Sequence, residues 1–272
     1  MAPRSASRGR RRRSESELGT WLLGGLVVCI TVLAVAGFIY LRMSAADRPV
    51  LDKQTLCPVD GGARSTTVVL LDTSDQWPEI TRAEVRKRLE KVAAQVPDYG
   101  LLELRLLDPA AQGGRVIFSK CNPGDGSNLS EITANPRLAH KRWMEQFATP
   151  LKTALDQTLT QSEADSSPIL STAQSIAVDR FDGAGPGHLI LISDMIEHTP
   201  DYSQYKGDLS YERYKQSAAY KKQHTDLKGA DVAIFYVQRL RMDSGSHIRF
   251  WTDWIHDNNG KLDEAVKLQG AD

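Results

Sequence analysis

The chain has 272 residues, with 34 lysines and arginines against 34 aspartates and glutamates, and 25% of its residues are charged. This length allows one large or two small domains with a proper core, and the near-average composition excludes a wholly disordered chain. A net charge of zero disfavours nucleic-acid binding driven by overall charge, and three cysteines are too few for a disulfide scaffold.

The N-terminal tail, residues 1–17, is strongly basic. It carries six arginines against Glu15 and Glu17, and serine, glycine and proline fill much of the rest. Such a segment cannot bury apolar surface, so we predict that it is disordered. Its charge is typical of a topology signal for membrane insertion, and binding to anionic lipid or nucleic acid is the alternative.

Residues 18–41 contain no charged side chain. A helix of this length is about 36 Å long, which is enough to span the hydrocarbon core of a bilayer. Trp21 and Tyr40 lie near the two ends, where aromatic side chains favour the membrane interface. A cleaved signal peptide is the alternative, but the run is long for one and no Ala-x-Ala site closes it. We predict a transmembrane signal anchor.

The arginines also predict the orientation of the anchor. Positively charged flanks stay in the cytoplasm, so we expect a single-pass membrane protein with a cytoplasmic N-terminus. Residues 42–56 then form a linker, and residues 57–272 form an extracytoplasmic domain, periplasmic or extracellular. Residues 43–272 hold 27 basic and 32 acidic side chains. We therefore expect membrane lipid to contact the anchor, and no nucleic acid to bind the domain.

The domain alternates predicted strands and helices. Continuous apolar runs rich in β-branched residues are typical of strands that are buried on both faces of a parallel sheet. The predicted strands are residues 66–71, 101–107, 115–121, 189–192 and 232–237. The predicted helices are residues 79–96, with a capping box from Thr81 to Glu84, and residues 138–161, 168–181, 209–223 and 247–259. Pro150 is expected to break or restart the second helix, and the segment 108–114 to form a hairpin.

This order predicts an α/β fold: a doubly wound, Rossmann-like and mostly parallel sheet with one antiparallel hairpin strand at its edge. In such sheets ligands bind beyond the carboxyl ends of the strands, where the strand order reverses. One strand is followed by Asp72, Ser74 and Gln76, and a later one by Asp194. If these strands are neighbours, their oxygen ligands meet at one crevice and suit a hard cation such as Mg²⁺.

The pattern of a strand followed by Asp-x-Ser, a hydroxyl residue opening a helix, and a strand ending in Ser-Asp resembles the von Willebrand factor A domain. The resemblance extends in element order over residues 57–268. Three short motifs match that family's metal-ion-dependent adhesion site, and here they supply Asp72, Ser74, Gln76, Ser167 and Asp194. Gln76 departs from the serine that is usual in the family, and Met195 departs from the usual glycine.

The resemblance implies that Mg²⁺, or another divalent cation, is bound at these five residues and completed by an acidic residue of a protein partner. Two alternatives stay open from the residues themselves. Asp72 and Ser74 could satisfy backbone donors in the loop after the strand. Ser167 could be an N-cap, with Pro168 as the first helical residue.

The resemblance also bears on the cysteines of the domain. In this fold the third strand runs antiparallel to the first, so Cys57 and Cys121 both lie near the bottom of the sheet. A disulfide between them is expected in an oxidising compartment, and two unpaired thiols are the alternative.

Five of the eight tyrosines lie in residues 202–220, directly after Asp194. Exposed tyrosines favour protein interfaces, whereas a helix that packs its aromatic side chains onto the sheet is the alternative. The interface candidates are Tyr202, Tyr205, Tyr211 and Tyr214. His198, four residues after Asp194, is either near the metal or simply solvated.

These features predict a membrane-anchored protein-binding or scaffolding module rather than an enzyme. A structural subunit of an envelope complex, with a non-functional metal site, is one alternative. A haloacid-dehalogenase-like phosphohydrolase, which places a nucleophilic aspartate after its first strand, is another. That family requires Asp-x-Asp, and residue 74 is a serine.

Overall fold

The computed structural model describes residues 12–46, 49–129, 131, 134–159, 164–182, 185–207, 209–239 and 243–271. The chain divides into two compact units. One contains the N-terminal helix, and the other runs from Pro49 to Asp272 apart from Glu131–Ala134.

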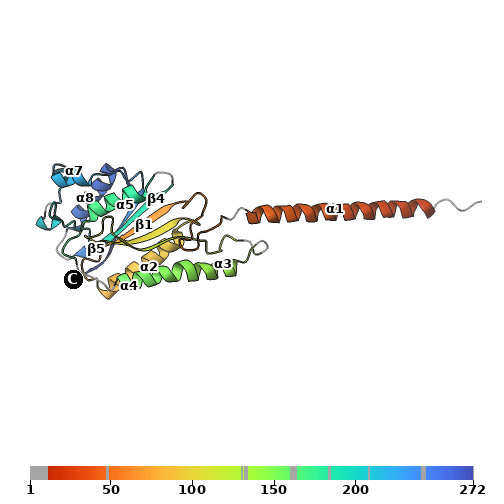
Figure 1. Ribbon diagram of the computed structural model, residues 1–272, viewed down its shortest axis with the longest axis horizontal. Helices are drawn as coiled ribbons and strands as arrows, with labels where there is room; N and C mark the ends of the chain where they lie inside the picture. The colour runs from red at the N-terminus through yellow and green to blue at the C-terminus, as the bar shows by residue number, and fades with distance from the viewer. Residues whose placement is uncertain are drawn as a thin grey trace, which may run out of the picture. The chain divides into compact units, whose positions relative to one another are not determined.

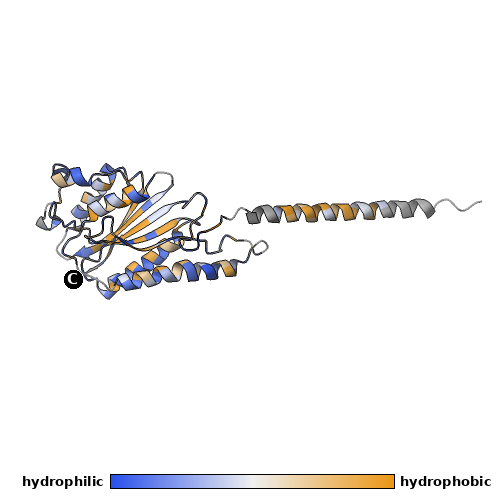
Figure 2. Ribbon diagram, in the orientation of Figure 1, coloured by the Kyte–Doolittle hydropathy of each residue, from blue (hydrophilic) through white to orange (hydrophobic). Residues whose placement is uncertain are grey.

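The first unit contains helix α1 (Arg12–Ala46). Its segment Trp21–Tyr40 is long and apolar enough to cross a membrane, and its side chains are exposed. Figure 2 shows the described middle of this helix as mostly hydrophobic. The helix begins at Arg12, so residues 12–17, which were predicted to be disordered, are helical instead. Residues 1–11 of the predicted tail lie outside the described residues.

The second unit is built on a six-stranded sheet with strand order β3-β2-β1-β4-β5-β6 (Figure 1). All neighbouring strands are parallel except β3, which pairs antiparallel with β2 at one edge. The strands are β1 (Thr66–Leu71), β2 (Leu101–Leu106), β3 (Arg115–Cys121), β4 (Gly187–Ser193), β5 (Asp231–Arg239) and β6 (Lys261–Ala271). The strand order reverses between β1 and β4, which confirms the predicted fold class and sets a crevice at their carboxyl ends.

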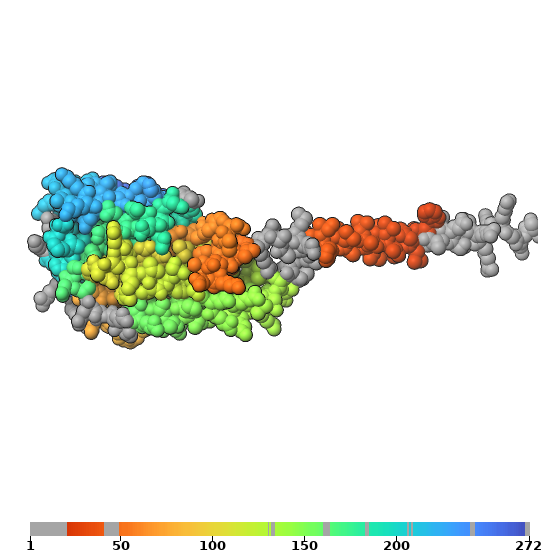
Figure 3. Space-filling view, in the orientation of Figure 1, coloured from red at the N-terminus to blue at the C-terminus, as the bar shows by residue number. Residues whose placement is uncertain are grey.

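Helices cover both faces of the sheet (Figure 1). Alternate residues of β1 enter different cores: Val68 and Leu70 pack on one face, Val69 and Leu71 on the other. The first core is closed by α5 (Ile169–Arg180), α6 (Tyr211–Lys215), α7 (Ala218–Gln223) and α8 (Ser244–Asp257). The second core is closed by α2 (Glu79–Gln95), α3 (Pro136–Trp143), the π-turn η1 (Met144–Ala148) and α4 (Thr149–Thr158). The segment α3–η1–α4 covers one flank of the domain in Figure 3.

Local departures from the predicted elements have identifiable causes. Pro150 lies in the first turn of α4, directly after η1, and the π-turn accommodates its missing N–H without ending the helix. The capping box is wrong: α2 begins at Glu79, and Thr81 is buried inside it, donating to the carbonyl of Gln269 at 2.5 Å. Strand β6 was not predicted, because the charged side chains of an edge strand hide its alternation.

Cys57 and Cys121 form a disulfide, as the resemblance predicted. It ties the segment before β1 to the end of β3, across a sequence separation of 64 residues. On the loop-entropy account, closing a loop of this length stabilises the folded state by about 4 kcal/mol.

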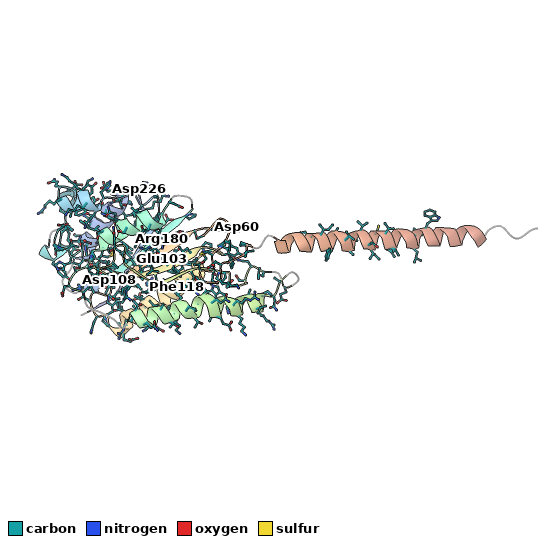
Figure 4. All side chains as sticks on the ribbon, viewed as in Figure 1. Asp60, Glu103, Asp108, Phe118, Arg180 and Asp226 are labelled. Carbon is teal, nitrogen blue, oxygen red and sulfur yellow. A yellow bond between two sulfur atoms is a disulfide. The ribbon has the colours of Figure 1, made fainter. Side chains whose placement is uncertain are left out.

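A cluster of charged side chains lies on the face of β2 that α5 covers. Glu103 is buried, and its carboxylate accepts hydrogen bonds from Arg105, Arg180 and Ser119. Burial acts to raise the pKa of Glu103, but the bonds from Arg180 and Arg105 outweigh it and lower the pKa. Figure 4 shows Glu103 and Arg180 lying together, so this contact joins β2 to α5.

Candidate functional site

The two aspartates predicted at the carboxyl ends of neighbouring strands are brought together. Asp72 follows β1 and Asp194 follows β4, and the two strands pair in parallel with Leu71 opposite Ile192. The backbone N–H of Asp72 donates to the carbonyl of Ile192 at 2.9 Å, and both aspartate side chains are buried.

Two hydroxyl groups and one backbone N–H, from three chain segments, surround Asp72. Its Oδ2 accepts hydrogen bonds from Ser167 Oγ at 2.8 Å and from Ser193 Oγ at 2.7 Å, and its Oδ1 accepts one from the N–H of Ser74 at 3.1 Å. Ser193 was not among the predicted site residues, although it immediately precedes Asp194 in the matched motif. Asp72 thus acts as the acceptor at the centre of the crevice.

Ser167 reaches Asp72 because its backbone is fixed to the loop after β4. Ser167 and His198 exchange two backbone hydrogen bonds, at 2.9 and 3.0 Å. Pro168, not Ser167, is the N-cap of α5, so the N-cap alternative for Ser167 is wrong. The imidazole of His198 contacts Ser203 Oγ at 2.9 Å, and its ring meets the Tyr205 ring edge-on.

Arg239, at the end of β5, supplies the positive charge of the crevice. Its Nε donates to Asp194 Oδ2, and its Nη2 donates to Asp75 Oδ2. The guanidinium also lies 6.0 Å from the centre of the Tyr205 ring. Nothing in the spacing of the sequence points to Arg239, because only the pairing of β4 with β5 brings it to the site.

The strand order, the antiparallel β3 and the convergence of Asp72, Ser167 and Asp194 at the switch point agree with the arrangement that the resemblance predicted. The domain has a von Willebrand factor A-like fold.

No family model matches the chain, and no curated protein does. Among solved structures, it is similar to an aerotolerance-related membrane protein from Bacteroides fragilis NCTC 9343, with 10% identity, a TM-score of 0.36, and coverage of 76% of this chain and 92% of that one. It is also similar to the human COPII-coat protein Sec24c, with 10% identity, a TM-score of 0.39, and coverage of 77% and 30%.

The von Willebrand factor A-like domain has donor types that suit a divalent cation, but their arrangement does not fit one. The crevice has a volume of about 10 Å³, room for about one water molecule, whereas Mg²⁺ usually keeps several waters when bound. The guanidinium of Arg239 already pairs with Asp194. Among the described residues, no group of three or more His, Cys, Asp or Glu side chains is placed to hold a metal ion. Mg²⁺ stays a prediction that requires Arg239 to leave.

The predicted ligands differ in how they join the crevice. Ser74 lines it together with Asp72 and Asp194. Ser167 is absent from the lining but donates to Asp72, whereas Gln76 is exposed and makes no hydrogen bond to Asp72 among the described residues. Burial, and then the negative charge of Asp72, raise the pKa of Asp194, and its ion pair with Arg239 opposes this by favouring the carboxylate.

The four tyrosines proposed for an interface divide into exposed and buried residues. Tyr205 is 55% exposed at the rim of the crevice, and Tyr202 is half-buried against the core. Tyr211 and Tyr214 are buried and pack on Phe250 of α8. The alternative of core packing therefore holds for Tyr211 and Tyr214, and Tyr205 is the most exposed of the four.

A buried polar layer supports the loop between β4 and η2 (Gln204–Lys206). Glu197 Oε2 accepts the N–H of Leu170 at the start of α5, at 2.9 Å. Gln204 Oε1 accepts the N–H of Glu197 and contacts His247 Nε2. Burial raises the pKa of Glu197 to about 8 and lowers that of His247 to about 4, so both side chains are held largely neutral near pH 7.

Proposed function

We propose that this chain is a membrane-anchored protein-binding module, with its contact surface at the carboxyl ends of β1, β4 and β5. The observation that carries the proposal is the pair formed by Tyr205 and Arg239 at the rim of the crevice. Tyrosine and arginine are the side chains most enriched among residues that dominate protein interfaces. Tyr205 is 55% exposed, and the Arg239 side chain is 30% exposed.

The anchor in this proposal is the Trp21–Tyr40 segment of α1, with the basic tail in the cytoplasm and the domain outside it. The Cys57–Cys121 disulfide supports an oxidising compartment for the domain, because such bonds are rare in the cytosol. A protease that cannot cross the membrane, added to intact cells or spheroplasts, should then remove the domain and leave the tail protected.

The alternative of a structural subunit without a working metal site is favoured by one observation, the ion pair between Arg239 and Asp194. That alternative still requires a partner protein, and it differs from the first in needing no reversible contact at the rim.

Photocrosslinking from the full anchored chain tests the proposal. A photoreactive phenylalanine analogue replaces Tyr205 in one variant and Val178 in the control. Val178 is 76% exposed near the end of α5. We expect a discrete protein adduct from position 205 and none from position 178. Equal adducts from both positions, or none from either, would reject the rim as the contact surface.

A further inference from the structure

We infer that Arg239 is the resident cation of the crevice and takes the place of the divalent ion that the fold would otherwise hold there. Asp72 and Asp194 are both buried at the switch point. Buried carboxylates require a positive charge or several hydrogen bonds, because removing an unpaired charge from water is strongly unfavourable. The inference concerns ion binding to this chain alone, so it does not depend on the proposed function.

The guanidinium is positioned as a bridge. Nε donates to the buried Asp194, and Nη2 donates to Asp75, which is exposed. A planar group that donates from two nitrogens can hold two carboxylates at once, whereas a lysine ammonium offers a single charged point. Arg239 therefore closes the crevice across the strand ends of β1, β4 and β5.

Asp72 has no need of a metal ion in this arrangement. Its two oxygens accept hydrogen bonds from Ser167, Ser193 and the N–H of Ser74. Both hydroxyls donate to Oδ2, so this oxygen of the carboxylate already has two hydrogen-bond partners. An ion would have to compete with these two donors for Oδ2 of Asp72 and displace the guanidinium from Asp194.

Competition between the two cations favours the arginine. The guanidinium stays charged at all physiological pH values and is tethered to the site. Mg²⁺ is strongly hydrated and gives up its water reluctantly. Removing the guanidinium frees Asp194 Oδ2 and enlarges a crevice of about 10 Å³, which creates the space and charge that a divalent ion requires.

The test compares thermal unfolding of the full chain in detergent, with chelator and with saturating Mg²⁺, Mn²⁺ or Ca²⁺. The variants are Arg239→Gln and the control Arg86→Gln. Arg86 also bridges two carboxylates, those of Glu79 and Asp156, and its side chain is 27% exposed. It lies on α2, away from the crevice.

We expect the unfolding temperature of the wild type and of Arg86→Gln to be unchanged by any of the ions. Arg239→Gln should unfold at a lower temperature in chelator and gain roughly 5 °C or more with at least one ion. The gain should disappear in Arg239→Gln combined with Asp194→Asn. If Arg239→Gln does not fold in chelator, folding of this variant when the ion is added reports ion binding in the same way as a gain in unfolding temperature.

Two results would overturn the inference. One is a stabilisation of the wild type by a divalent ion, which would show that the ion binds with Arg239 present. The other is an Arg239→Gln variant that binds no ion, measured by the loss of the free Mn²⁺ electron paramagnetic resonance signal. Arg239 would then be only one more ion pair on the surface.

Discussion

Ser167 and Asp72 are separated by 95 positions in the chain, yet Ser167 Oγ donates to Asp72 Oδ2 at 2.8 Å. This bond connects the loop before α5 to the end of β1 across the point where the strand order reverses. It is the contact that joins two of the three sequence motifs, and the stability of the crevice should depend on it.

Ser167→Ala removes one donor from the buried Asp72 carboxylate. We expect the free energy of unfolding to fall by about 1–2 kcal/mol, because a hydrogen bond to a charged group is lost. Urea unfolding of the domain measures this. Ser171→Ala is the control, since its hydroxyl makes a longer bond of 3.3 Å to the carbonyl of Pro168. If the two variants lost equal free energy of unfolding, the bond from Ser167 to Asp72 would stabilise the domain no more than the longer bond of Ser171.

Glu197 should make stability depend on pH. Its folded-state pKa of about 8 lies above its ordinary value of 4.5, mainly because the side chain is buried. A raised carboxyl pKa favours folding below the ordinary value, and this contribution is lost as the pH rises through 8. Relative to Glu197→Gln, the wild type should lose a few kcal/mol of stability between pH 5 and pH 8. Urea unfolding at each pH measures this difference. If the free energies of unfolding of the two proteins changed with pH in parallel, the raised pKa of Glu197 would be contradicted.

Arg180→Ala leaves Glu103 with Arg105 as its remaining charged partner. Because Glu103 is buried and Arg180 is partly exposed, we expect a loss of about 2 kcal/mol, less than for a fully buried pair. Glu103 has a lowered pKa, so its contribution is present above the ordinary value and lost as the pH falls. The difference in unfolding free energy between Arg180→Ala and the wild type should shrink at acidic pH. A constant difference would exclude the ion pair as its cause.

The paired variant Cys57→Ser with Cys121→Ser should lose about 2–4 kcal/mol of stability, because the loop between the two cysteines becomes free in the unfolded state. Cys29→Ser, in α1, is the control and should leave the unfolding of the domain unchanged. Denaturant unfolding under non-reducing conditions gives the comparison, and an effect of Cys29→Ser as large as that of the pair would be inconsistent with the structure.

Prediction from the sequence succeeded where a local pattern sufficed. The apolar runs at residues 66–71 and 189–192 predicted two central strands, and the carboxylates behind them predicted the crevice. Burial on both faces demands such runs, so the signal is strong. The edge strand β6 has no continuous apolar run, because charged side chains interrupt it. The sequence pattern therefore did not predict it as a strand.

The electrostatics of the site could not be predicted in the same way. Arg239 is one of many charged residues in the sequence, and only the three-dimensional pairing of β5 beside β4 brings it to Asp194. The tyrosines show the same limit, because Tyr205 and Tyr214 have similar sequence surroundings but opposite burial. Motif spacing predicts which backbone positions meet, whereas charge pairing depends on side chains from strands that are distant in sequence.

The role of the rim is tested most directly by photocrosslinking from position 205 of the full chain in native membranes, with and without chelator. We predict a partner adduct whose yield does not change when divalent ions are removed, because Arg239 supplies the charge of the crevice. An adduct that disappears in chelator and returns with Mg²⁺ would contradict the role of Arg239, and the absence of any adduct would contradict the rim as a binding surface.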